Sequence, residues 1–262
     1  MDKGISMLKS KLIRLKEKLK LEKPIMIVGL PGVGLVGKLV AEHLIDELKA
    51  EKAIEIYSPH FPPQVLVNAD CTVRPVSNSI YIGKAKGLDL VFLVGDNQST
   101  SSTGHYELCS LYLDLAEELQ VSRIYTLGGY PTGKLSYDKT ILGVANKPEL
   151  IEELRAYGIE FRESEPSGGI VGASGLLIAF SQLREIDAAC LMGMTPGYMV
   201  DPKSAQSLLK MLCSILGIEV NTESLEKKAE EMESIVEKLK EKEEQQKLQE
   251  MKPTDEDLRY IG

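Results

Sequence analysis

The chain has 262 residues, 43% of them hydrophobic, which is enough for one large α/β domain with a substantial core and one additional segment. Its formal net charge of -8 argues against nucleic acid as a partner, because binding along a phosphate backbone needs a clustered basic face. No apolar run reaches the roughly 20 residues of a membrane span, so we expect a cytoplasmic protein with no membrane partner.

Residues 1–23 are predicted to form a basic amphipathic helix. They hold seven lysines and one arginine against three acids. Five apolar residues recur at spacings of three or four, which places them on one face of a helix: Ile5, Leu8, Leu12, Leu15 and Leu19. With no aromatic anchor for a membrane surface, this helix is expected to pack against protein.

Residues 24–48, PIMIVGLPGVGLVGKLVAEHLIDEL, match two nucleotide-binding patterns. Gly32, Gly34 and Gly37 fit Gly-x-Gly-x-x-Gly at a predicted strand-to-helix junction, and the same segment fits Gly-x-x-x-x-Gly-Lys ending at Lys38. The second pattern requires Ser or Thr after the lysine as a magnesium ligand, whereas this chain has Leu39.

The dinucleotide pattern has a candidate ribose ligand in Glu55, although this residue lies inside a predicted strand and not at its end. We therefore interpret Gly32, Gly34 and Gly37 as a structural glycine loop that lets a helix approach the sheet closely, with no cofactor. The alternative is a nucleotide- or dinucleotide-binding enzyme that uses the loop of residues 29–38.

The middle of the chain, residues 24–220, is predicted to form one domain with a three-layer α/β/α fold and a mixed sheet. Five strand candidates follow too closely for helices between them, so part of the sheet must be antiparallel: 53–57, 64–68, 72–76, 79–85 and 88–95. Helices and strands then alternate, which is typical of crossovers covering both faces of a sheet. The expected helices are 104–119, 148–156, 171–183 and 201–216, and the expected strands are 123–129, 141–144, 159–162 and 188–194.

The polar loop from Asp96 to Thr103 follows a predicted strand, where open α/β sheets usually bind ligands, and is the one place where a small molecule is expected. No catalytic residue is predicted, because none of the three histidines has a recognisable nucleophile partner. No metal is predicted either, since the four cysteines contain no Cys-x-x-Cys pair.

Residues 221–252 are predicted to form a charged amphipathic helix. From residue 221 to the last residue, 262, the sequence holds thirteen acidic and eight basic residues. Pro253 ends this helix and leaves residues 253–262 as a flexible tail. The apolar tail residues Leu258, Tyr260 and Ile261 are candidate partner-docking residues.

Five segments together carry a family resemblance: GLPGVGLVGKLVAEHLI at 29–45, GDNQSTSSTGHYEL at 95–108, TLGGYPTG at 126–133, GGIVGASGLL at 168–177 and ACLMGMTPGYMVDPKSAQSLL at 189–209. They resemble the archaeal members of the proteasome assembly chaperone family, homologues of the eukaryotic proteasome-assembling chaperone 2. The resemblance implies a purine nucleoside phosphorylase-like fold without an established phosphorylase activity. It also implies a homo-oligomer that binds proteasome core-particle subunits or a related family member.

Some members of that family end in a hydrophobic-Tyr-any tripeptide that inserts between proteasome α subunits. This chain ends in Tyr260-Ile261-Gly262, so Ile261 occupies the Tyr position and Tyr260 stands one place early. The resemblance thus implies a non-catalytic assembly chaperone or proteasome-binding adaptor, whose tail docks in a shifted register or on a different partner.

Overall fold

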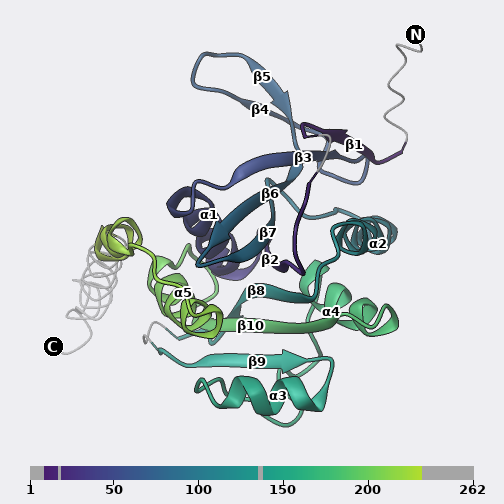
Figure 1. Cartoon of the computed structure of the whole chain (residues 1–262). Coiled ribbons are helices and arrows are strands. Elements are labelled where there is room, and N and C mark those ends of the chain that lie inside the picture. Colours follow the sequence, from purple (N-terminus) through teal and green to yellow (C-terminus); the bar gives the residue numbers. More distant parts are fainter. Residues whose placement is uncertain (1–8, 17–18, 135–137, 232–262) are drawn as a thin grey trace, which may run out of the picture.

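The computed structural model describes residues 9–16, 19–134 and 138–231, and these residues are built around one mixed sheet (Figure 1). In chain order its strands are Lys11–Arg14 (β1), Ile25–Gly29 (β2), Glu51–Tyr57 (β3), Asn78–Ala85 (β6), Leu88–Gly95 (β7), Arg123–Pro131 (β8), Ile141–Ala145 (β9) and Asp187–Thr195 (β10). Across the sheet the order is β1-β3-β6-β7-β2-β8-β10-β9. Strands β7, β2, β8 and β10 are parallel, and the other pairs are antiparallel, which confirms the mixed sheet.

Helices cover both faces of this sheet and confirm the three-layer α/β/α architecture (Figure 1). They are Val36–Glu47 (α1), Ser102–Glu118 (α2), Pro148–Arg155 (α3), Ala173–Leu183 (α4) and Pro202–Leu216 (α5). Helices α2 and α4 pack on one face, and α1, α3 and α5 pack on the other. None of the described helices is both long and apolar enough to cross a bilayer.

The central strands are buried on both faces, and their residues alternate between two cores. Met26 of β2 lies beside Val91 and Ile124 of the neighbouring strands, and these residues share the core under α2 and α4. The next residue, Ile27, shares the opposite core with its neighbour Phe92. A strand that is buried on both faces needs apolar residues at nearly every position. The run IMIV in β2 meets this requirement.

A hairpin of Val65–Val67 (β4) and Val73–Pro75 (β5) forms a separate two-stranded sheet. Figure 1 shows it extending beyond the edge of the main sheet that β1 and β3 form. The strand pattern predicted both of its strands, but they do not join the main sheet.

The predicted N-terminal helix is wrong over the described residues 9–16. Lys11–Arg14 forms edge strand β1, antiparallel to β3, with Leu12 beside Ile56. The helical spacing was misleading because the free edge of β3 supplies backbone partners, and such tertiary pairing overrides a local pattern. Residues 1–8, 17 and 18 lie outside the described residues.

The predicted strand at residues 159–162 is also wrong, because only a single bridge joins Glu160 to Leu142 of β9. At the other end, residues 223–231 are helical, where the charged C-terminal helix was expected to begin. Leu225 of this segment is buried in the same core as α1 and α5. The remainder of the expected helix and the tail, with Leu258, Tyr260 and Ile261, lie outside the described residues.

Candidate functional site

The glycine loop lies at the carboxyl end of β2, where α1 makes its closest approach to the sheet. A Cβ on Gly37 would lie 2.1 Å from the carbonyl oxygen of Leu127 in β8. A Cβ on Gly29 would lie 2.4 Å from the Cβ of Ala41 in α1. Real Cβ atoms do not approach other atoms so closely, so the contact between α1 and the sheet requires glycine at both positions.

The other two glycines of the loop differ from each other in what they require. Gly34 has φ of 62°, in the left-handed region that disfavours other residues, and a Cβ there would lie 2.9 Å from Thr195 Oγ1. A Cβ on Gly32 would have its nearest neighbour, the carbonyl oxygen of Leu30, at 3.9 Å, which is an ordinary contact. Packing therefore does not require glycine at position 32.

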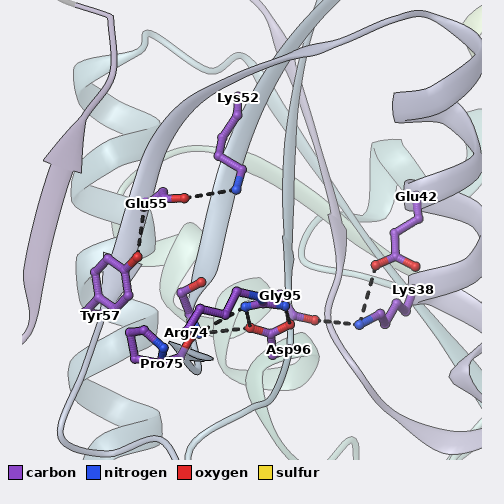
Figure 2. A network of polar contacts seen from close by, with 10 residues as sticks. Lys38, Glu42, Lys52, Glu55, Tyr57, Arg74, Pro75, Gly95 and Asp96 are labelled. Carbon is purple, nitrogen blue, oxygen red and sulfur yellow. Dashed lines mark hydrogen bonds and ion pairs between the residues drawn. The ribbon is translucent and has the colours of Figure 1, made fainter. Parts of the chain in front are cut away.

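Lys38 binds groups within the chain and does not project into an open loop (Figure 2). Its Nζ donates a hydrogen bond to the carbonyl oxygen of Gly95 at 2.9 Å and lies 3.4 Å from Glu42 Oε1. A lysine that held a phosphate would have to leave both partners. Leu39, which follows it, packs its side chain against the core under α1.

Glu55 is not placed to bind a ribose at the glycine loop. Strands β6 and β7 separate its strand, β3, from β2. Its carboxylate accepts hydrogen bonds from Lys52 Nζ at 2.9 Å and Tyr57 Oη at 3.0 Å (Figure 2). The hydrogen bond from Lys52 is the main reason that the pKa of Glu55 lies below its ordinary value. The sheet order thus removes the candidate ribose ligand of the dinucleotide pattern.

The polar loop that begins at Asp96 binds parts of the fold to one another. Asp96 forms two hydrogen bonds with the guanidinium of Arg74 in β5, at 2.6 and 2.8 Å, and accepts a third from the amide of Ser77 at 3.0 Å (Figure 2). Partial burial raises the pKa of Asp96, but these hydrogen bonds outweigh it and leave the pKa below its ordinary value. The loop therefore anchors the hairpin.

Gln98 links two further segments in the same loop. Its Nε2 donates to the carbonyl oxygen of Pro31 at 2.7 Å, and its Oε1 accepts from the amide of Ala173, the first residue of α4, at 3.0 Å. Ser101 caps α2 by accepting from the amide of Gly104 at 3.1 Å. These backbone amides and the Pro31 carbonyl are therefore already hydrogen-bonded within the chain.

The cavity beside this loop is too small for a ligand. Its volume is about 10 Å³, which is at the lower limit for one water molecule. It is lined by Leu30, Gln98, Ser99, His105, Leu108, Cys109, Tyr112 and Ala173. The arrangement does not favour the expected small-molecule site at Asp96 to Thr103.

Two buried cysteines lie within the core under α2 and α4. Burial raises the pKa of the Cys109 thiol to about 12 and that of Cys190 to about 11, so neither is a ready nucleophile at neutral pH. No group of three His, Cys, Asp or Glu side chains in the described part of the chain is arranged to hold a metal ion.

Two features of the structure have no counterpart in the sequence patterns, the first of them at the buried His43. His43 of α1 lies with Nε2 2.6 Å from the carbonyl oxygen of Asn221 and Nδ1 3.2 Å from Ser224 Oγ, so it holds the start of the C-terminal helix. The second feature is an open depression of about 560 Å³ at the base of the hairpin. It is lined by Ser58, Pro59, Phe61, Pro62, Pro63, Gln64, Val65, Pro75 and Val76. The sequence shows that several prolines precede β4. Only the folded structure shows that they lie next to β5.

The comparisons with known proteins agree with this architecture. A model of the PAC2 family matches residues 26–240. The uncharacterized protein MJ1210 of Methanocaldococcus jannaschii is 42% identical over 245 residues, which cover 92% of this chain and 93% of that protein.

Two solved structures from Pyrococcus furiosus are similar over most of the chain. PbaB, an archaeal proteasome activator, has a TM-score of 0.83 and 38% identity, covering 89% of this chain and 100% of PbaB. PbaA, an archaeal homolog of proteasome-assembly chaperone, has a TM-score of 0.75 and 25% identity, covering 92% of this chain and 95% of PbaA.

Proposed function

The chain belongs to the PAC2 family, and from this membership we propose that it is a non-catalytic chaperone or adaptor of the proteasome. The most direct support is the similarity to PbaB, an archaeal proteasome activator, over the full length of that protein. The relation to PbaA, a homolog of proteasome-assembly chaperone, supports the same class of partner. The partners proposed for this chain are subunits of the proteasome core particle, or a related family member, and further copies of itself.

The observation that carries the non-catalytic part of the proposal is the use of polar groups at the carboxyl edge of the parallel strands. Lys38 binds Gly95, Asp96 binds Arg74, and Gln98 binds Pro31 and Ala173. An active site would leave such groups turned toward a pocket for a substrate. Here these three side chains join segments of the fold, so the glycine loop is proposed to be structural.

Partner binding is proposed to use the C-terminal arm. The helix at residues 223–231 is held on the body by Leu225 and His43, which fixes the last of the described residues in place. The proposed docking residues are Leu258, Tyr260 and Ile261, further along the chain. Apolar side chains at the end of a polar arm suit insertion into a groove between partner subunits.

Binding of the full-length chain to purified archaeal core-particle α and β subunits tests the proposal. We expect complex formation on size exclusion, and a loss of affinity of at least about tenfold when residues 253–262 are removed, which corresponds to about 1.4 kcal/mol. Equal affinity after truncation would contradict the role of the tail. No complex with any core-particle subunit would contradict the proposed function.

A ligand panel tests the nucleotide alternative on the same protein. A nucleotide at 100 times its dissociation constant would stabilise the fold by about 2.7 kcal/mol. We expect no change in melting temperature with ATP, NAD or nucleosides. A reproducible upward shift, lost in Lys38→Ala, would instead favour an enzyme that uses the glycine loop.

A further inference from the structure

The hairpin exposes an unusually apolar face. Val65 pairs with Pro75 and Val67 pairs with Val73, so these four side chains lie on one face of the two strands. Val65 is 58% exposed, Val67 is 71% exposed and Val73 is 62% exposed. Leu66, on the other face, packs against the main core. All four residues of the outward face are uncharged.

This hairpin is a built structure and not a frayed loop. At its tip, Asn68 Nδ2 donates to Thr72 Oγ1 at 2.9 Å, and the amide of Thr72 donates to Asp70 Oδ1 at 3.1 Å. At its base, Arg74 is held by the two hydrogen bonds to Asp96 (Figure 2). Because an isolated two-stranded hairpin is only marginally stable in water, contacts at both ends are needed to hold the valines in place.

The depression at the base of the hairpin is apolar as well. Its exposed lining includes Pro59, Pro63, Val65 and Pro75, whereas Phe61 and Val76 are almost fully buried. The hydroxyl of Ser58, one of its few polar groups, already contacts Ser10 Oγ at 2.9 Å. Small-molecule sites combine an apolar lining with several polar groups that orient the ligand, and this depression offers few. Its surface instead suits apolar side chains.

We propose that the hairpin and the depression form a two-fold interface between two copies of this chain. The tip of each hairpin, with Val67 and Val73, lies in the depression of the other copy. This proposal rests on the self-association that the proposed function includes, and it adds which surface of the chain forms the contact between copies.

A second copy is the partner that the observations favour, because the same surface carries both an exposed apolar hairpin and an apolar depression, with Val65 and Pro75 belonging to both. A two-fold contact requires that the same patch face itself, so that a protrusion of one copy meets a recess of the other. The chain also has a formal net charge of -8, and an uncharged contact face avoids bringing like charges of two copies together. The outward face of the hairpin provides such a contact.

The first test measures the mass of the assembly across a dilution series. Relative to the wild type, we expect Val67→Asp combined with Val73→Asp to halve the mass, or to raise the concentration of dissociation at least about tenfold. The matched control is Val171→Asp, because Val171 is 92% exposed just before α4, away from the hairpin. The control is expected to keep the wild-type mass.

The two ways of failing are distinct. A wild-type assembly that the hairpin variant leaves intact would overturn this interface while self-association stands. A wild-type chain that stays monomeric would overturn self-association and the interface together. Binding to core-particle subunits is measured separately and does not depend on either result.

A disulfide test applies even where the charged variant fails to fold. Cys71 is the exposed cysteine at the hairpin tip, and Gln64 lines the depression. In one chain these residues flank β4, about 10 Å or more apart at 3.3 Å per residue, which is too far for a disulfide. We expect Gln64→Cys to form a covalent dimer on mild oxidation, and Cys71→Ser in that background to abolish it. No covalent dimer would overturn the proposed arrangement.

Discussion

Gly37 is the residue on which the contact between α1 and β8 depends. A Cβ at this position would meet the backbone of Leu127 and not a flexible side chain, so no rotamer change can relieve the overlap. The helix would have to move away from the sheet and loosen a core that includes the fully buried Val40 and Leu44. The glycine pattern at this junction thus has a packing explanation that involves no phosphate.

We expect Gly37→Ala to lower the free energy of unfolding by about 3 kcal/mol, the upper part of the range for overpacked cores. Urea unfolding followed by circular dichroism measures the change. Gly32→Ala is the matched control and should change stability by less than about 0.5 kcal/mol, because its Cβ meets nothing closer than 3.9 Å. Equal effects of the two substitutions would contradict the packing explanation.

Residue chemistry allowed part of this site to be predicted from the sequence. Leu39 excludes a magnesium ligand after the lysine on chemical grounds alone. The partner of Lys38 was not predictable, because Gly95 lies 57 residues away and reaches it through the pairing of β7 with β2. The three glycines also looked equivalent, and only the contacts of each Cβ distinguish Gly32 from Gly37.

Among the elements, the hairpin depends on the loop after β7. Asp96 joins Arg74 of β5 to the main sheet, so one carboxylate couples the two sheets. The folded-state pKa of Asp96 lies below its ordinary value, in spite of partial burial, because of Arg74 and the Ser77 amide. Stability from this group is therefore present above the unfolded pKa of about 3.9 and is lost as the pH falls through the folded pKa.

We expect Asp96→Asn to lower the free energy of unfolding by about 1 kcal/mol at pH 7, since Arg74 is partly exposed and solvent weakens the pair. The difference from wild type should persist down to about pH 5 and shrink below about pH 4. Urea unfolding at several pH values measures it. The exposed Glu163→Gln should show less than about 0.5 kcal/mol at every pH. A pH-independent difference for Asp96→Asn would contradict the proposed ion pair.

The elements show where sequence periodicity is sufficient and where it fails. Strands β2 and β7 were predicted from short apolar runs, and both are buried in the sheet. Strand β1 was misread because Leu12 and Leu15 also fit a helix, and its β structure depends on the free edge of β3, some 40 residues away. The departure of β4 and β5 from the main sheet likewise depends on contacts of Arg74 that no local pattern encodes.

In the whole molecule, the hairpin and the C-terminal helix lie on different parts of the body (Figure 1). The hairpin is attached through β5 and Asp96, beyond β3, whereas residues 223–231 pack beside α1 and α5. The two attachments use different side chains. Self-association through the hairpin and partner binding through the C-terminal arm are therefore expected to be separable by mutation.

The contacts of the C-terminal helix with the body include Leu225, which is 1% exposed, the contacts of His43 with Asn221 and Ser224, and a hydrogen bond of 2.7 Å from Gln206 to Glu226. Leu225→Ala removes about 2 kcal/mol or more of packing, so amide exchange of residues 223–231 should accelerate at least about tenfold. Lys228→Ala, on the exposed side of the same helix, should leave exchange within about twofold of wild type.

The same variant separates the two proposed interactions. A loosened helix no longer fixes the direction of the arm, so we expect Leu225→Ala to weaken capture of core-particle subunits several-fold, through the entropy of reordering the arm on binding. Its mass in solution should remain that of the wild type, because the hairpin contacts do not include Leu225. The hairpin variant should give the reverse result, with the wild-type affinity per chain and a halved mass. If Leu225→Ala instead reduced the mass, the C-terminal helix would itself be part of the contact between copies, and the two functions would share one surface.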